Sequence, residues 1–152
     1  MRDSRTVANR FLDLARENND SLTPMQLLKL VYIAHGWMLG LHGRPLIRDE
    51  VEAWQYGPVI PRLYNAIRQF KSQPVCEKIR SAPAERMDAA EENIARQVYE
   101  IYGDRSGPAL SRLTHQKDSP WDKVYEHGSY GTVIPNDLIE DHYAMLAKRA
   151  AA

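Results

Sequence analysis

The stretch TPMQLLKLVYIAHGWMLGL, residues 23–41, determines how the rest of the chain can be arranged. It opens with the signals of a helix start, because Thr23 can cap the helix, Pro24 suits the first turn and Gln26 completes a capping box. From residue 25 to residue 41 nearly every position is apolar. A helix that is apolar on most sides belongs inside a bundle. The sequence therefore predicts a central helix around which the other elements pack.

The small and polar residues of this helix lie on two sides of it. Lys29, Gly36 and Gly40 share one side, whereas His35 points the opposite way among apolar neighbours. Two glycines one turn apart allow another backbone to approach closely, or they leave room for an inserted side chain, and close packing is the simpler interpretation. We interpret His35 as a hydrogen-bonded core histidine, because the helix offers it no second metal ligand within one turn.

Segments on either side of the central helix predict about six helices in total. The other five are expected over residues 6–18, 61–70, 88–102, 107–115 and 137–150. Two β-prone runs, residues 46–47 and 51–54, indicate a small hairpin that leads into a turn at Gly57-Pro58. Residues 72–83 and 118–131 are expected to be irregular. The prediction is a mainly α protein, a compact single-domain helical bundle over residues 1–152 with a small β-hairpin.

Composition limits the compartment and the class of partner. Twenty basic residues balance twenty acidic ones, so the net charge does not argue for a dedicated nucleic-acid or membrane-surface protein. The one cysteine, Cys76, has no second thiol for a disulfide or a zinc site, which favours a reducing compartment. The first residues lack the apolar core of a signal peptide, and no apolar run is long enough to span a membrane. We expect a cytoplasmic protein with no membrane partner.

Charge is nonetheless divided along the chain. Residues 57–80 contain five basic residues and one acid, whereas residues 83–104 contain six acids and two basic residues. Two interpretations stay open: these are solvated helix faces, or the basic stretch attracts an acidic partner or a nucleic acid. Arg62 and Arg68 are the candidates for such a contact.

Motifs of the common catalytic classes are missing from the sequence. There is no glycine-rich nucleotide loop, no zinc-protease motif, no serine-hydrolase elbow and no paired cysteine motif. Lys29, His115 and Asp118 could be assembled into a catalytic set, but chains of this size commonly contain such triples in salt-bridged or solvated roles. We predict no enzyme activity, no cofactor and no metal, and an uncharacterised enzyme remains the second alternative function.

Aromatic residues are more numerous than one core of this size needs, with three Trp and eight Tyr. Those in expected turns and loops are Trp54, Tyr56, Trp121, Tyr125 and Tyr130. Aromatic side chains at such places are frequent anchors of protein interfaces. For the two tryptophans, pinning of the turns by a buried ring is the competing interpretation.

Several short motifs occur in a specific order along the chain. They are Leu22-Thr23, residues 27–34, Gly43-Arg44-Pro45-Leu46, Glu50, Ala53-Trp54, Tyr56-Gly57-Pro58-Val59, Pro61-Arg62-Leu63-Tyr64, Leu113-Thr114-His115 and Ser119-Pro120-Trp121. With Ile134, Asp137, Ile139 and Tyr143 they closely resemble the Panacea domain, the SocA-like antitoxin family that also includes phage-associated GepA-like proteins. The resemblance spans residues 22–143.

This resemblance implies a mainly helical antitoxin of a bacterial or prophage toxin–antitoxin system. Such a protein neutralises a cognate toxin, encoded by an adjacent gene, by direct binding, and ClpXP protease is a further candidate partner if it acts as a proteolytic adaptor. The resemblance supplies no catalytic residues. Its signature positions are Lys29, Tyr32, Trp54, Gly57, Pro58, Tyr64 and Trp121, to which Tyr56, Arg62 and Arg68 are added as candidate partner-binding residues. A nucleic-acid-binding regulator that uses residues 62–80 is the alternative function.

Overall fold

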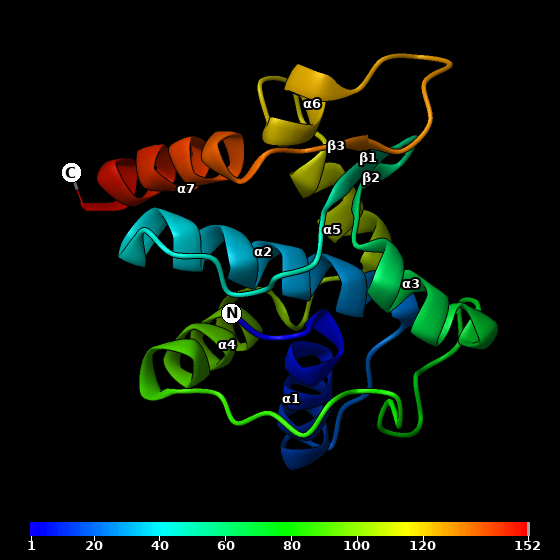
Figure 1. Cartoon of the computed structure of the whole chain (residues 1–152). Coiled ribbons are helices and arrows are strands. Elements are labelled where there is room, and N and C mark those ends of the chain that lie inside the picture. The colour runs from blue at the N-terminus through cyan, green and yellow to red at the C-terminus, as the bar shows by residue number, and fades with distance from the viewer. Residues whose placement is uncertain (152) are drawn as a thin grey trace.

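The computed structural model describes residues 1–151, which form seven α-helices, one 3-10 helix and three short strands (Figure 1). The helices are α1 (Ser4–Glu17), α2 (Pro24–His42), α3 (Pro61–Ile67) with η1 (Arg68–Phe70) after it, α4 (Ala89–Tyr102), α5 (Gly107–Thr114), α6 (Pro120–Val124) and α7 (Asn136–Ala151). The strands are β1 (Glu52–Trp54), β2 (Gly57–Val59) and β3 (Thr132–Val133). The prediction of a mainly α bundle with a small β element is confirmed.

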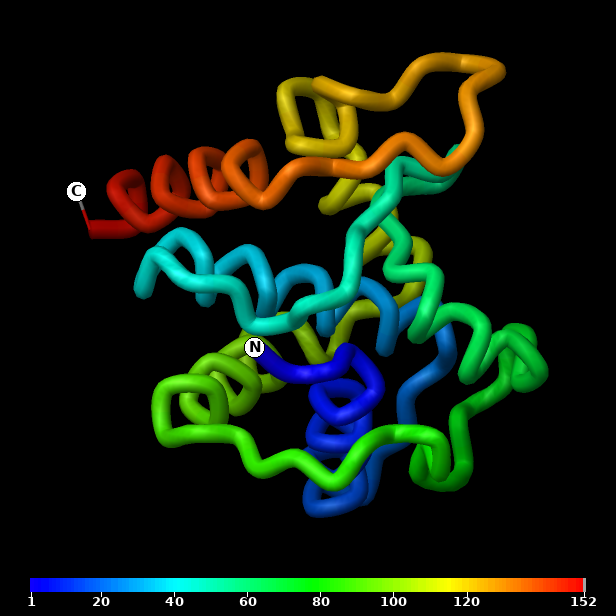
Figure 2. The backbone as a smooth tube through the Cα atoms, in the orientation of Figure 1, coloured from blue at the N-terminus to red at the C-terminus, as the bar shows by residue number. Residues whose placement is uncertain are grey.

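Helix α2 begins and ends as its sequence indicates. The backbone N–H of Gln26 donates to Thr23 Oγ1 at 3.3 Å, and the N–H of Thr23 donates to Gln26 Oε1 at 2.9 Å, so the capping box is formed. Gly43 ends the helix in the left-handed region, with φ +66°. Figures 1 and 2 show α2 crossing the middle of the molecule, with α1 and α4 on one side and α7 on the other.

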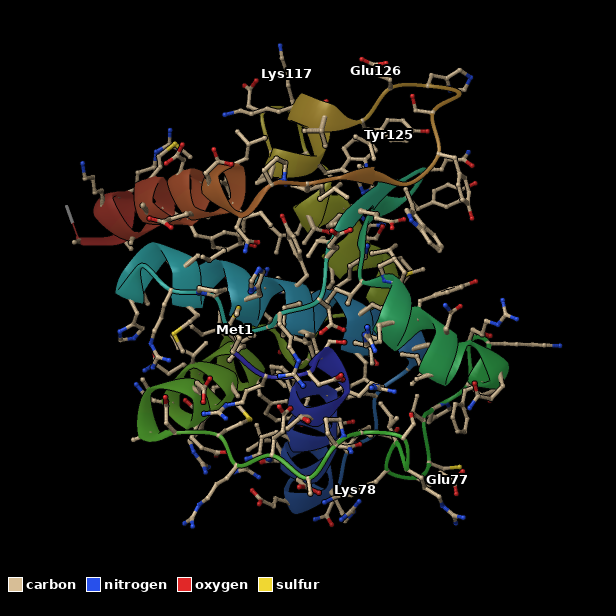
Figure 3. All side chains as sticks on the ribbon, viewed as in Figure 1. Met1, Glu77, Lys78, Lys117, Tyr125 and Glu126 are labelled. Carbon is tan, nitrogen blue, oxygen red and sulfur yellow. The ribbon has the colours of Figure 1, made fainter. Side chains whose placement is uncertain are left out.

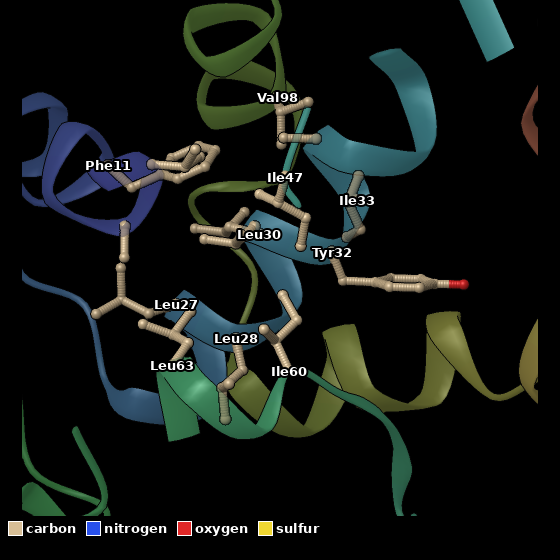
Figure 4. Packing of buried hydrophobic residues seen from close by; sticks show 14 of the residues in the cluster. Phe11, Leu27, Leu28, Leu30, Tyr32, Ile33, Ile47, Ile60, Leu63 and Val98 are labelled. Atoms are coloured by element: carbon tan, nitrogen blue, oxygen red, sulfur yellow. The ribbon is translucent and has the colours of Figure 1, made fainter. Parts of the chain in front are cut away.

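The hydrophobic core is built along α2. Leu30 and Ile33 are fully buried, as are Phe11 of α1 and Leu63 of α3. Figure 4 shows these side chains close together, with Val98 of α4 at the far end of the cluster. The apolar stretch of α2 is therefore surrounded by helices from both halves of the chain, and its predicted role as the core helix is confirmed.

Gly36 and Gly40 mark the line along which α7 packs on α2. A Cβ atom at Gly36 would overlap the ring of Tyr143, and one at Gly40 would lie 2.7 Å from the backbone carbonyl carbon of Tyr143. The ring of Tyr143 is buried there and packs edge-on against Trp37, with 5.2 Å between ring centroids. One glycine thus admits a side chain and the other admits a backbone, so both interpretations of the pair apply.

His35 is a hydrogen-bonded core histidine, as the sequence predicted. Its Nδ1 accepts the backbone N–H groups of Leu46 and Ile47 at 3.2 and 3.3 Å, and its Nε2 lies 3.0 Å from Oδ1 of Asn136. Burial lowers the pKa of His35. The imidazole therefore joins α2, the segment after it and the first turn of α7.

The hairpin differs from the one expected. Residues 46–47 do not pair with residues 51–54; Ile47 instead forms an isolated parallel bridge with Arg2. Strand β1 pairs antiparallel with β2 and with β3, giving the order β2-β1-β3. The expected location of the first strand was therefore wrong.

Pro58 explains why the actual second strand was missed. It lies opposite Ala53 in the ladder, although proline lacks an N–H and usually argues against a strand. Here β2 is an edge strand, where the missing donor is tolerated. Gly57 enters the strand with φ +121°, a conformation that residues with side chains rarely adopt.

A second difference lies in the segment that was expected to be irregular over residues 118–131. It contains the single-turn helix α6, which Ser119 caps by accepting the N–H of Asp122 at 3.2 Å. Five residues are too few for helical periodicity to show in a sequence. The other expected connection, residues 72–83, has no helix or strand and reaches α1, where Lys78 is placed (Figure 3).

Candidate partner-binding groove

A groove of about 840 Å³ lies between the start of α2, the β1–β2 hairpin, the end of α3 and the segment after α6. We call it the aromatic groove, and it is lined by Pro24, Met25, Leu28, Lys29, Trp54, Gln55, Tyr56, Val59, Tyr64, Arg68, Lys71, Tyr125 and residues 127–131. Among these, Lys29, Trp54, Tyr56, Tyr64 and Arg68 were predicted from the sequence as candidate or signature residues, and Tyr125 and Tyr130 as aromatics of expected loops. Residues that are far apart along the chain are thus brought together in one hollow.

Trp54 is the centre of the aromatic wall. Its ring packs edge-on against Tyr64, with centroids 5.1 Å apart, and stacks with Tyr130 at 5.9 Å. Its Nε1–H donates to Oε1 of Glu52 at 2.9 Å, and its backbone carbonyl accepts Nε1–H of Trp121 at 2.6 Å. These contacts fix both the ring and the backbone of Trp54, so the wall is formed before any partner arrives.

Trp121 supports the groove from behind without lining it. Its ring stacks on Tyr125 at 4.6 Å and packs edge-on against His115 at 5.3 Å. Figure 3 shows Tyr125 where the chain leaves α6, near the strands. Trp121 thus pins the turns, as one interpretation of the loop aromatics held, whereas Trp54 both pins a turn and lines the groove.

Tyr56 presents an exposed ring on a fixed backbone. Its side chain is 68% exposed at the tip of the hairpin, yet its carbonyl accepts the hydroxyl of Ser111 at 2.6 Å. The turn is therefore anchored to α5 while the ring remains free to contact another molecule. Tyr130, which stacks on Trp54, is 88% exposed.

Lys29 is the buried cation of the groove. Its Nζ donates to the carbonyl of Pro58 at 2.8 Å, and the residue is only 3% exposed. Burial lowers the pKa of Lys29 from 10.5 to about 7, because the charged form loses its hydration. Within residues 1–151 it forms no ion pair with a carboxylate.

Gly57 is required beside this lysine for two reasons. Its φ of +121° disfavours a side chain, and a Cβ atom would lie 2.9 Å from Nζ of Lys29. The same Cβ would lie 3.6 Å from Oγ1 of Thr114. Lys29, Gly57 and Pro58 therefore form one unit that connects α2 to the hairpin at the groove.

The rim of the groove is positively charged. Arg68 of η1 and Lys71, directly after η1, are exposed and line the groove together with His127, whereas no described Asp or Glu lines it. Neither Arg68 nor Lys71 belongs to an ion pair of the described chain. Both charges are thus available to a partner.

Two candidate residues lie away from the groove. Arg62 pairs with Oδ2 of Asp49 at 3.4 Å. Tyr32 is buried 6.4 Å from the ring of Tyr143, and its hydroxyl has no hydrogen-bond partner among the described residues. Lys78, also in the basic stretch, pairs with an acid of α1. The basic residues of 62–80 are therefore divided among separate places.

Lys29, His115 and Asp118, the residues that could have formed a catalytic set, share no hydrogen bond with one another within residues 1–151. Lys29 bonds to the Pro58 carbonyl and His115 to its own helix, whereas the N–H of Asp118 bonds to Asp122.

No group of three His, Cys, Asp or Glu residues suited to a metal ion occurs in the described part of the chain. No helix of residues 1–151 combines the length and apolar character needed to cross a bilayer.

Lys71 and His127 are groove residues that sequence reasoning did not select. Lys71 takes φ +55°, which turns the chain sharply after η1. The sequence signal for Lys71 was its place three residues after Arg68 in the basic stretch; for His127 there was none, because it reaches the groove only through the packing of the segment after α6.

Comparison with known proteins assigns the family. The family described as Antitoxin SocA-like, Panacea domain, matches residues 27–122. This chain belongs to that family. Antitoxin SocA of Caulobacter vibrioides (strain NA1000 / CB15N) is 33% identical over 133 residues, which covers 80% of this chain and 70% of the relative. No solved structure matches the chain significantly.

Family membership confirms the resemblance found in the sequence and supports an antitoxin role in a toxin–antitoxin system. The matched residues include Lys29, Trp54, Arg68 and Trp121, whereas Tyr130 lies beyond them. The matched region thus contains the hairpin, the buried cation and one side of the rim.

Proposed function

We propose that this protein is an antitoxin that neutralises a protein toxin by direct contact through the aromatic groove. The observation that carries the proposal is the meeting of Trp54, Tyr56 and Tyr64 with the unpaired cations Arg68 and Lys71 in one open hollow. Aromatic residues and Arg dominate the binding energy of protein interfaces, particularly where they line a pocket.

The rigidity of the aromatic wall around Trp54 also supports a role of the groove in toxin binding. Trp54 is held by hydrogen bonds at its ring and its carbonyl, and the Tyr56 backbone is held by Ser111. A preformed wall loses little conformational entropy on binding, so more of the contact energy remains as affinity. The exposed rings of Tyr56 and Tyr130 supply apolar area that a partner would remove from water.

Growth rescue tests the proposal. The protein is co-expressed with the product of the adjacent gene, and we expect wild type to restore growth and the Tyr56→Ala/Tyr130→Ala variant to fail. The matched control is Ile101→Ala/Met145→Ala, which removes two exposed apolar side chains from α4 and α7. Rescue by the groove variant at wild-type protein levels would refute the proposal.

Two routes lead from binding to neutralisation: masking of the toxin's active surface, or delivery of the toxin to ClpXP protease. They are separated by repeating the rescue in cells that lack ClpX. Rescue that persists there indicates masking, and rescue that is lost, with toxin accumulating, indicates delivery. Neither result changes the expected role of Tyr56 and Tyr130.

A further inference from the structure

The charges at the aromatic groove indicate what part of the toxin it receives. Three basic residues, Lys29, Arg68 and Lys71, line the groove without a described acid among the lining residues. Lys29 is the unusual one, since a buried ammonium that lacks a carboxylate loses hydration without Coulombic compensation. A negative group brought to this groove would meet the unpaired charges of Arg68 and Lys71, and it would favour the charged form of Lys29, which lies in a poorly hydrated place where electrostatic attraction is strong.

The apolar lining sets a second requirement. Met25, Leu28 and Val59 lie in the groove beside Trp54, and Met25 is 40% exposed. Aliphatic and aromatic walls of this kind are filled by an apolar side chain of a partner. The groove therefore fits a short partner segment that carries both negative charge and an apolar side chain.

We propose that the aromatic groove binds an acidic segment of the toxin, with carboxylates paired to Arg68 and Lys71 and an apolar or aromatic side chain packed against Trp54. This inference rests on the proposed function and specifies the part of the toxin that is recognised. A concave groove suits a projecting segment of the partner rather than a flat face.

Single-stranded nucleic acid is the competing anionic ligand, because bases stack on aromatic rings and phosphates pair with cations. The structure favours the peptide. One face of Trp54 is already stacked on Tyr130, and the aliphatic side chains of Met25, Leu28 and Val59 also line the groove, where a base would gain no stacking. Nucleic acid binding is therefore an outcome of the test that would overturn the inference.

Zero-length crosslinking tests the charge pairing. A carbodiimide joins a lysine amine to a carboxylate only when the two are in contact, so we apply it to the purified complex of this protein with the product of the adjacent gene. We expect Lys71 to be joined to Asp or Glu residues clustered in one toxin segment that also contains an apolar residue. Lys148, exposed on α7, is the internal control and should give no such link.

A charge swap then tests whether the contact matters. Arg68→Glu/Lys71→Glu should weaken toxin binding at least about tenfold, and changing the crosslinked toxin acids to Lys should recover most of the loss. Arg80→Glu/Lys148→Glu makes the same change of net charge outside the groove and should stay within about twofold of wild type. Unfolding midpoints of all variants are compared first, so that loss of folding is not read as loss of binding.

The outcomes separate the inference from the proposed function. If the complex forms and depends on Tyr56 and Tyr130 while Lys71 joins no toxin carboxylate, the acidic-segment inference is overturned and the proposed function stands. If a 15-nucleotide dT oligomer displaces the toxin through Arg68 and Lys71, the groove is a nucleic-acid site and the inference is overturned as well. If no complex forms, both are overturned.

Discussion

Replacing Lys29 by Met should change how the stability of the protein depends on pH. The pKa of Lys29 is about 7 in the folded protein and 10.5 in its ordinary environment. Between these values the unfolded chain holds a proton that the folded chain has released, so the free energy of unfolding of wild type rises with pH in this window. This gain in the free energy of unfolding is absent at low pH, where Lys29 is protonated in both states and the folded protein carries a buried charge.

The expected slope is about 1.4 kcal/mol per pH unit, which is the free energy equivalent of one unit of pKa. From about pH 7.5 to about pH 9.5, wild type should therefore gain on the order of 2 to 3 kcal/mol relative to Lys29→Met. Met cannot donate to the Pro58 carbonyl, and leaving that group unpaired lowers the stability of the variant by about 1 to 3 kcal/mol at every pH. The unpaired carbonyl lowers the free energy of unfolding of the variant equally at all pH values, so it does not change the slope of the difference between the two proteins.

Urea unfolding of both proteins, followed by tryptophan fluorescence at several pH values, measures this difference. Tyr32 and Tyr143, whose pKa values are raised by burial, are common to both proteins and cancel in the comparison. Lys148→Met, at an exposed lysine, is the control and should give a flat difference from wild type. A flat difference for Lys29→Met would show that Lys29 keeps its ordinary pKa and is not desolvated as argued.

Four further substitutions test the packing, each by the free energy of unfolding in urea. Leu30→Ala should cost about 2 to 5 kcal/mol, because Leu30 is fully buried and leaves a cavity; a negligible change would place α2 outside the core. Gly40→Ala should cost about 1 to 3 kcal/mol by pushing α7 away at Tyr143, and an unchanged midpoint would mean that the two helices are not in close contact. Gly57→Ala should cost about 1 to 3 kcal/mol from backbone strain alone, and a neutral effect would exclude the positive φ. Tyr32→Phe removes a buried hydroxyl without a described partner, so stability should stay equal or rise; a loss above about 1 kcal/mol would reveal a partner.

Local signals predicted the helices well because their causes lie within a few residues. The capping box of α2 joins Thr23 to Gln26, and the one at α4 joins Asp88 to Glu91, so each helix start is encoded beside itself. The role of His35 was also predictable, since its apolar surroundings leave a histidine few options other than hydrogen bonding in the core.

The strand pairing depends on contacts that no local pattern contains. Strand β3 reaches β1 from far along the sequence, with Thr132 opposite Ala53. Residues 46–47 are apolar and β-prone for a different reason, because they are buried where the chain passes α1 and α2. Burial and strand pairing favour the same residue types, so composition alone did not distinguish them.

The aromatic groove was predicted only in its parts. Trp54 and Tyr56 stood out as aromatics in turns, and Arg68 as a charge in a basic stretch, but nothing in the sequence placed them beside Lys29. The same stretch contains Arg62, whose charge is taken up by Asp49 on another part of the surface. Arg62 and Arg68 are thus close in sequence but lie at different places on the surface, because they extend from different sides of the α3–η1 segment.

Binding kinetics of the purified protein with the product of the adjacent gene, at two salt concentrations, test whether the aromatic groove is the toxin-binding surface. Arg68→Glu/Lys71→Glu should slow association and reduce its dependence on salt, whereas Tyr56→Ala should mainly speed dissociation, each in a protein that unfolds at the wild-type midpoint. We expect each variant to weaken affinity by about tenfold or more, which is roughly 1.4 kcal/mol. If both variants bind within about twofold of wild type at both salt concentrations, the toxin binds elsewhere and the groove is not the interface.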